Sequence, residues 1–270
     1  HCTVRSRRSR RVEKNLSVLT RLELAKDWVR DSGNFLKENI TAPLEITEKT
    51  RYDDLVTNFD QEVQEQLVQK IHHHFPNDAI LAEEDQEKQS YDDKTPHLWV
   101  IDPIDGTTNF IVQKDNFAIM VAYYEFGVGK FGLILDVMQD KLYWCDSHKA
   151  FCNQRELVMK EATLAHSLLG VNSYMYRTNY SGLLDLSQHT LGVRIIGSAG
   201  ISYGQLLDGK IVAYFSNLQP WDYAAGSIIA DRIGYVTMTL AGEMPQLNCR
   251  EKVFTAPAKL ISEIQKYIRN

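Results

Sequence analysis

The chain has 270 residues, of which 44% are hydrophobic and 24% are charged, and its formal net charge is −5. This composition excludes a disordered chain, and the mildly acidic balance disfavours nucleic-acid binding, which normally needs a basic surface. No run approaches the roughly 20 apolar residues of a membrane span, so we expect no membrane association. Four scattered cysteines without a Cys-x-x-Cys pair indicate reduced thiols and a cytoplasmic protein.

The first residues of the chain are strongly basic and almost without apolar content. Nothing after them continues this pattern, so we interpret residues 1–14 as a flexible leader or a remnant of an expression tag. A nucleic-acid or membrane-surface arm is the alternative. We expect a single domain over 15–270, with an N-terminal half of about 15–160 and a C-terminal half of about 161–270.

The N-terminal half combines helical spacing with short apolar runs. Two helices come first, then two buried strands that each end in carboxylates, and then a strand meander with tight turns. The predicted ranges are 18–36 and 63–71 for the helices, 79–82 and 98–101 for the buried strands, and 117–124, 131–137 and 142–145 for the meander.

The C-terminal half alternates strands with helices. The predicted strands are 167–171, 194–196, 211–215 and 235–240, and the predicted helices are 201–207, 222–233 and 256–268. A meander followed by this alternation predicts an α/β fold with α+β character in the N-terminal half, in which two layered halves enclose a site.

The segment Asp102-Pro-Ile-Asp105-Gly-Thr-Thr-Asn-Phe110 follows the second buried strand. The strand delivers Asp102 to its end, Pro103 fixes the exit direction, and Gly106 lets the backbone approach a ligand. Mg²⁺ prefers carboxylate, water and phosphate oxygens, which such a segment can gather. A capped turn at the strand end explains either aspartate alone, but not the whole pattern with Glu83-Glu84 after the preceding strand.

A second segment, Trp221-Asp-Tyr-Ala-Ala-Gly226, opens a predicted helix. Asp222 at a helix start can be a simple N-cap, and the same position also suits a phosphate nearby. The small residues after it favour close packing of this helix against a neighbour.

These two segments resemble the inositol monophosphatase family, the lithium-sensitive, magnesium-dependent phosphatases that include fructose-1,6-bisphosphatase and phosphoadenosine-phosphate phosphatase relatives. The motif Asp-Pro-x-Asp-Gly-Thr-x-Asn-Phe matches 102–110, and Trp-Asp-x-Ala-Ala-Gly matches 221–226. The resemblance covers roughly residues 15–270. It implies a layered α-β-α-β-α sandwich, a homodimer, two or three Mg²⁺ ions per site, and hydrolysis of a small phosphate monoester by metal-activated water.

The resemblance also implies roles for individual residues. The metal ligands would be Glu84, Asp102, Asp105, Asp222 and the carbonyl of Ile104. Thr107 and Glu84 would orient and deprotonate the attacking water, with Asp60 bonded to the threonine and Lys49 nearby. The substrate would contact Asp105, Gly106, Thr107, Gly197, Ser198, Ala199, Ser216 and Asp222.

Ser216 departs from the family, because it stands where inositol phosphatases have a glutamate that contacts an inositol hydroxyl. A neutral serine cannot make that charge-assisted hydrogen bond. The substrate is therefore open between inositol-1-phosphate or a related sugar phosphate and NADP⁺ 2′-phosphate, 3′-phosphoadenosine-5′-phosphate or fructose-1,6-bisphosphate. A non-catalytic Mg²⁺/phospholigand sensor is a less favoured alternative. The run His72-His73-His74 is interpreted as a solvated helix end, since adjacent helical residues point in different directions.

Overall fold

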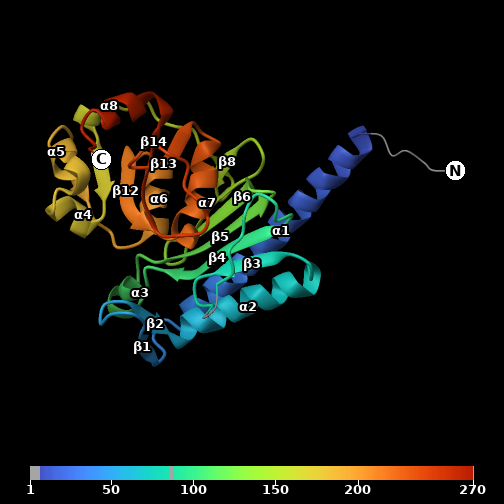
Figure 1. Cartoon of the computed structure of the whole chain (residues 1–270). Coiled ribbons are helices and arrows are strands. Elements are labelled where there is room, and N and C mark those ends of the chain that lie inside the picture. Colours follow the sequence, from blue (N-terminus) through green and yellow to red (C-terminus); the bar gives the residue numbers. More distant parts are fainter. Residues whose placement is uncertain (1–6, 86–87, 270) are drawn as a thin grey trace.

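The structure is a computed structural model that describes residues 7–85 and 88–269. Five layers follow one another through the molecule (Figure 1). Helices α1 and α2 cover one face of a seven-stranded sheet, α6 and α7 lie between this sheet and a five-stranded one, and short helices cover the far face. The predicted α/β class and the α-β-α-β-α layering are confirmed.

The seven-stranded sheet has the order β3-β4-β5-β6-β7-β8-β9, and only the β3–β4 pair is parallel. Its central strands are apolar on both faces, because helices cover both sides. The bounds in this half are α1 Arg7–Glu38, β1 Ile46–Glu48, β2 Leu55–Thr57, α2 Asn58–His74, β3 Ala79–Ala82, β4 Leu98–Asp105, α3 Thr107–Gln113, β5 Ala118–Glu125, β6 Val128–Asp136, β7 Lys141–Cys145, β8 Ala150–Cys152 and β9 Arg155–Glu156.

The five-stranded sheet has the order β11-β10-β12-β14-β13, with β10 parallel to both neighbours and β14 antiparallel to both of its own. A second core lies under it, where α4, α5 and α8 pack against β10, β12 and β14. The bounds are β10 Leu168–Val171, α4 Ser173–Arg177, α5 Leu183–Ser187, β11 Gly192–Arg194, α6 Ala199–Leu207, β12 Ala213–Leu218, α7 Pro220–Asp231, β13 Tyr235–Thr239, β14 Glu251–Pro257 and α8 Ile261–Gln265.

Several sequence-based boundaries differ from the structure, and three of them have a clear physical reason. Helix α1 begins at Arg7, so the boundary expected at residue 15 falls inside a helix, while residues 1–6 lie outside the described part. The strand expected over 194–196 ends at Arg194, because the chain then turns through Gly197 at φ 79°. The helix expected from 256 is short and starts later, since residues 256–257 pair with β13 as the end of β14.

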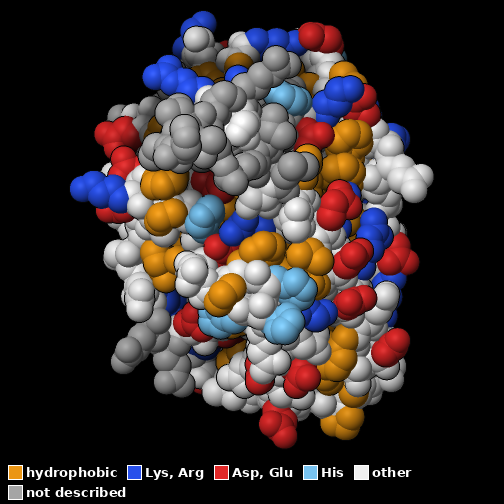
Figure 2. Space-filling view, turned by 90° about the vertical axis from the view of Figure 1, so that its right-hand side faces the viewer, with side chains coloured by type: hydrophobic (Ala, Val, Ile, Leu, Met, Phe, Trp, Pro, Cys, Tyr) orange, Lys and Arg blue, Asp and Glu red, His pale blue; other side chains and the backbone are white. Residues whose placement is uncertain are grey.

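The surface carries mixed charge on the face that Figure 2 shows. Acidic and basic side chains are interspersed there, and hydrophobic ones lie in small separate groups. The three consecutive histidines are exposed at the end of α2, as expected for a solvated helix end. No helix in the described ranges is both long enough and apolar enough to cross a membrane.

A buried ion pair ties α1 to the seven-stranded sheet. Arg21 donates from Nε to Asp78 Oδ2 at 2.8 Å and from Nη2 to Oδ1 at 2.9 Å, and Trp99 Nε1 donates to the same carboxylate at 2.8 Å. Both charged side chains are less than 8% exposed. Because the geometry is bidentate, removing one partner leaves a buried charge with too few hydrogen bonds.

We expect Arg21→Met to lower the free energy of unfolding by about 3–5 kcal/mol, because Asp78 then stays buried without its cation. Urea unfolding followed by circular dichroism measures this loss. Arg30→Met, an exposed position on the same helix, is the control and should change stability by less than about 0.5 kcal/mol. Equal effects in the two variants would show that the ion pair contributes nothing specific.

Candidate active site

Three aspartates from both halves of the chain meet where the end of β4 approaches the start of α7. Asp102 and Asp105 end β4, where the pairing with β5 shifts register between the two residues. Asp222 lies in the first turn of α7. One carboxylate oxygen from each of the three lies within 4.8 Å of the others. Oxygen ligands that converge in this way suit a hard divalent cation.

Glu83 joins this group, whereas the sequence-based choice was Glu84. Strand β3 pairs in parallel with β4 so that Ala82 lies beside Ile101, and the next residues, Glu83 and Asp102, are therefore neighbours. Their carboxyl groups lie close enough for the charge of Glu83 to raise the pKa of Asp102. Glu84 instead binds Lys49, whose Nζ lies 2.8 Å from Glu84 Oε2 and 3.5 Å from Glu83 Oε1. Glu83 thus lies beside Asp102, while Glu84 lies close enough to Asp60 for its charge to raise the pKa of that residue, and Glu84 stays the ligand that the resemblance implies.

Burial and mutual repulsion raise the pKa values of this group. Burial is the main cause at each position, and it raises the pKa of Glu83 to about 7 and of Asp222 to about 8. The pKa of Asp102 lies well above its ordinary value, because burial is joined by the neighbouring charge of Glu83. Asp105 is raised less, since Ser198 and the Gly200 amide donate to it. Without a cation, the carboxylates resist ionisation together.

One oxygen of this group shows directly that a partner fits here. Asp102 Oδ1 is buried, and it accepts no hydrogen bond from any residue in the described part of the chain. A buried polar atom without a partner is costly, and an oxygen-seeking cation between the carboxylates would satisfy it while cancelling their repulsion. The residues present therefore fit Mg²⁺.

We expect the melting temperature of the metal-free protein to fall by at least about 4 °C between about pH 5 and 8. The raised pKa values of Glu83 and Asp222 mean that the folded state holds protons that the unfolded state has released. Stability is therefore lost as the pH rises through about 7 and 8. Differential scanning calorimetry in EDTA measures it. Added Mg²⁺ should raise the melting temperature more at pH 8 than at pH 6, and an equal shift at both would contradict the repulsion.

A threonine–aspartate pair lies beside the carboxylates. Thr107, the first residue of α3, donates from Oγ1 to Asp60 Oδ1 at 2.8 Å, as the sequence predicted. Asp60 also accepts hydrogen bonds from the amide and the hydroxyl of Thr57, which caps α2. The start of this helix therefore fixes the position of the Asp60 carboxylate. Burial raises the pKa of Asp60 to about 6, against the opposing effect of these hydrogen bonds. The hydrogen bond to Asp60 fixes the orientation of the Thr107 hydroxyl. Its proton points to Asp60, so its oxygen can accept a hydrogen bond from a water.

Two cavities adjoin Asp222. The smaller, of about 270 Å³, contains the predicted residues Gly197, Ser198, Ala199 and Ser216. Ser198 caps α6 and bonds Asp105, so the loop that starts this helix is tied to the carboxylates. Apart from Asp105 and Asp222, all of its lining residues are neutral. This compartment can receive the alcohol half of a phosphate ester.

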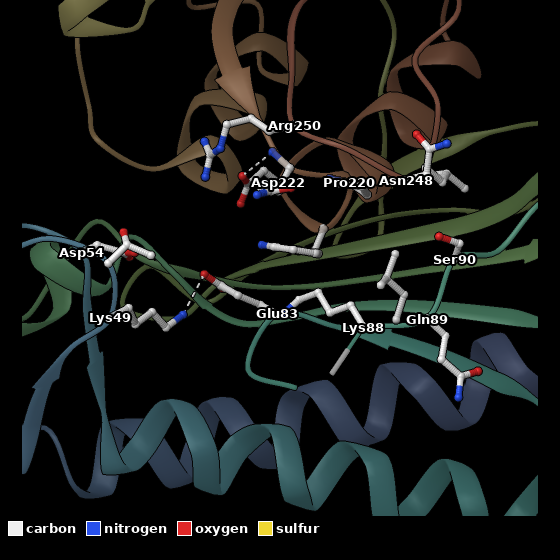
Figure 3. A pocket seen from close by; sticks show the side chains of 15 residues that line it. Lys49, Asp54, Glu83, Lys88, Gln89, Ser90, Pro220, Asp222, Asn248 and Arg250 are labelled. Carbon is white, nitrogen blue, oxygen red and sulfur yellow. Dashed lines mark hydrogen bonds and ion pairs between the residues drawn. The ribbon is translucent and has the colours of Figure 1, made fainter. Parts of the chain in front are cut away.

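The larger cavity, of about 500 Å³, has a different character. Figure 3 shows Lys49, Glu83 and Lys88 along one wall, and Asp222, Asn248 and Arg250 along the other. Lys88 and Arg250 are exposed cationic residues that the sequence did not single out. They come from the β3–β4 connection and from the residue before β14, so no local motif links them.

The start of α7 differs in detail from the prediction. Its N-cap is Gln219, and Asp222 accepts the Gln219 amide at 2.9 Å from within the first turn. Close packing against α6 is confirmed, because a Cβ on Gly226 would lie 2.3 Å from the Tyr203 ring. Glycine there lets α6 and α7 approach each other, and this holds Asp222 near the loop that bears Ser198.

Carboxylates that can hold Mg²⁺, next to an oriented hydroxyl and two open cavities, define a metal-assisted hydrolase of phosphate esters. The model of the inositol monophosphatase family matches residues 18–269, and the chain belongs to this family of Mg²⁺-dependent phosphoric monoester hydrolases.

Individual relatives agree with this assignment. The inositol-1-monophosphatase of Bacillus subtilis is 38% identical over 232 residues, covering 82% of this chain and 86% of the relative. A fructose-1,6-bisphosphatase/inositol-1-monophosphatase of Thermotoga maritima is 30% identical, covering 88% and 91%. The crystal structure of an inositol monophosphatase/NADP phosphatase with Mg²⁺ and phosphate superposes with a TM-score of 0.84 at 25% identity, covering 93% of this chain and 95% of that one.

Proposed function

We propose that the chain hydrolyses inositol-1-phosphate or a related sugar phosphate, with two or three Mg²⁺ ions held by Asp102, Asp105, Asp222, the Ile104 carbonyl and one or both of Glu83 and Glu84. The observation that carries the proposal is the convergence of Asp102, Asp105 and Asp222 around an oxygen without a partner. When bound, Mg²⁺ supplies charge neutralisation and lowers the pKa of water. Its specific placement among these ligands is inferred from the family.

The chain's own residues would activate the water, hold the carboxylates and bind the two parts of the substrate. Thr107 donates a hydrogen bond to Asp60, so its oxygen can accept a hydrogen bond from the attacking water, whose proton would pass through the hydroxyl to Asp60. Lys49 holds Glu84 and approaches Glu83, so it fixes the carboxylates on this side. The amides of Gly106 and Thr107 would bind the phosphate group. Displacement in line would then release the alcohol into the cavity with Ser198 and Ser216.

A nucleotide substrate is the second candidate, and the neutral lining of this cavity favours it. Ser216 is 5% exposed and lines the cavity, whose only charged residues in the described lining are Asp105 and Asp222. A serine at position 216 makes no charge-assisted contact that would select a polyol such as inositol, which supports the 2′-phosphate of NADP⁺ or 3′-phosphoadenosine-5′-phosphate as a substrate. The structural relative described as an inositol monophosphatase/NADP phosphatase supports this candidate.

A substrate panel with Mg²⁺ tests both candidates. Phosphate release is measured from inositol-1-phosphate, NADP⁺, 3′-phosphoadenosine-5′-phosphate and fructose-1,6-bisphosphate, each with Mg²⁺ and with EDTA. We expect turnover that EDTA abolishes, with kcat/KM highest for inositol-1-phosphate or another sugar phosphate. A preference above about tenfold for a nucleotide would replace the first candidate by the second. Equal release in EDTA would overturn both.

We also propose a homodimer and a cytoplasmic location. The family resemblance supports the dimer. The free Cys145, Cys152 and Cys249 support a reducing compartment. Light scattering after gel filtration would give a mass of about twice 31.0 kDa for the dimer.

A further inference from the structure

The larger cavity contains cationic residues that belong neither to the carboxylate group nor to its ion pairs. Its cationic residues are Lys49, Lys88 and Arg250, and its carboxylates are Asp54, Glu83 and Asp222. Lys49 is bound to Glu84 and Glu83, so it belongs to the carboxylate group. A cation held by Glu83 and Asp222 would neutralise these two, and Lys88 and Arg250 would then dominate the cavity.

Neither of these two cations is neutralised by an ion pair in the described part of the chain. Lys88 Nζ donates to the carbonyl of Asp85 at 2.7 Å and lies 5.0 Å from the centre of the Trp221 ring. Arg250 Nη1 donates to the carbonyl of Asn217 at 3.0 Å, which leaves its other donors facing the cavity. Backbone carbonyls position both side chains, while Asp85 lies close enough to Lys88, and Asp222 to Arg250, for each cation to favour the ionised carboxylate.

The smaller cavity contrasts with this arrangement. Its lining has no cationic residue, and it already provides room for the alcohol beside Ser198 and Ser216. The two cavities share Asp222, so both adjoin the reacting group. The cations of the larger cavity are thus additional to what binding of a simple monoester requires.

We propose that Lys88 and Arg250 form a second anion site, which binds a phosphate group other than the one being hydrolysed. The site binds either inorganic phosphate, as the released product or from solution, or a second phosphate group on the substrate. A guanidinium and an ammonium on facing walls, with Asn248 and Ser90 also in the cavity lining, match the several acceptor oxygens of such an anion. Binding of a second phosphate on the substrate rests on the proposed phosphatase function, whereas binding of inorganic phosphate does not.

The test compares the wild type with the double variant Lys88→Gln/Arg250→Gln. Isothermal titration of the Mg²⁺-loaded protein with inorganic phosphate should show two binding events in the wild type, and the double variant should lose the weaker one. For the substrate source, the preference for fructose-1,6-bisphosphate over inositol-1-phosphate should fall by about tenfold, since each exposed charge contributes about two- to fivefold. The kcat/KM for inositol-1-phosphate should change by less than about twofold.

The titration reports on inorganic phosphate, and the substrate preference reports on a second phosphate of the substrate. Loss of the weaker binding event or of the preference in the double variant supports the site. Lys94→Gln, an exposed lysine in the same β3–β4 connection but outside the cavity lining, is the matched control. Arg250→Lys should retain most of the effect, and melting temperatures show that the variants are folded. Unchanged phosphate binding and unchanged preference would overturn the proposal. An equal loss for inositol-1-phosphate would also overturn it, by assigning both residues to the reacting phosphate. Absent turnover would refute the phosphatase proposal alone, because the phosphate titration needs none.

Discussion

Glu83→Gln is expected to lower kcat/KM by at least about a hundredfold, while Glu84→Gln lowers it by about tenfold or less. Glu83 lies beside Asp102, and its charge raises the pKa of that aspartate. Its replacement removes a charge that the divalent cation needs. Glu84 acts through Lys49, at 2.8 Å, so its loss weakens the support of the group but not the group itself.

The two glutamates form a matched pair, because they are adjacent and receive the same isosteric change. The measurement is kcat/KM at saturating Mg²⁺, followed by a Mg²⁺ titration of each variant. We expect the apparent Mg²⁺ affinity to fall mainly in Glu83→Gln. The opposite order of effects would confirm Glu84 as the ligand, as the resemblance implies.

Asp102→Asn is expected to reduce turnover by more than about a thousandfold and to stabilise the metal-free protein. Asp102 is 1% exposed, and its pKa is raised by burial and by the charge of Glu83. An asparagine of the same shape removes one repelling charge and can donate to Glu83. Activity and metal-free stability should therefore change in opposite directions.

Calorimetry in EDTA at pH 8 measures the stability part of this prediction, with an expected rise of at least about 3 °C in melting temperature. Asp27→Asn, at an exposed position on α1, is the control and should change neither quantity. A lower melting temperature for Asp102→Asn would mean that the aspartate has a stabilising partner, and would contradict the repulsion.

The local sequence pattern predicted much of the site, because several of its residues lie at the ends of strands and helices that the pattern of apolar residues indicates clearly. Strand β3 was predicted with the bounds that it has, and the Asp60–Thr107 bond agrees with the resemblance. The choice of Glu84 came from the resemblance, because two adjacent carboxylates look alike in a sequence. The parallel register of β3 and β4 adds that Glu83 lies beside Asp102, and this register depends on pairing between strands.

Other elements were missed for physical reasons. Strand β14 begins with charged residues and gains its burial from β12 and β13, which neighbour it only in the folded sheet. Lys88 and Arg250 are 162 positions apart and share a cavity only after the two halves pack together. Tertiary contacts of this kind leave no periodic signal in the chain.

The metal-binding residues and the residues of the smaller cavity lie on different elements, and this bears on how substrate specificity can evolve in this enzyme. Asp102 and Asp105 end a buried central strand, while Ser198 and Ser216 belong to the start of α6 and to β12, in the other half. Substitutions on those two elements can reshape the alcohol compartment while β4 stays unaltered. Selection could therefore exchange one released alcohol for another in few mutational steps, without passing through an inactive ancestor.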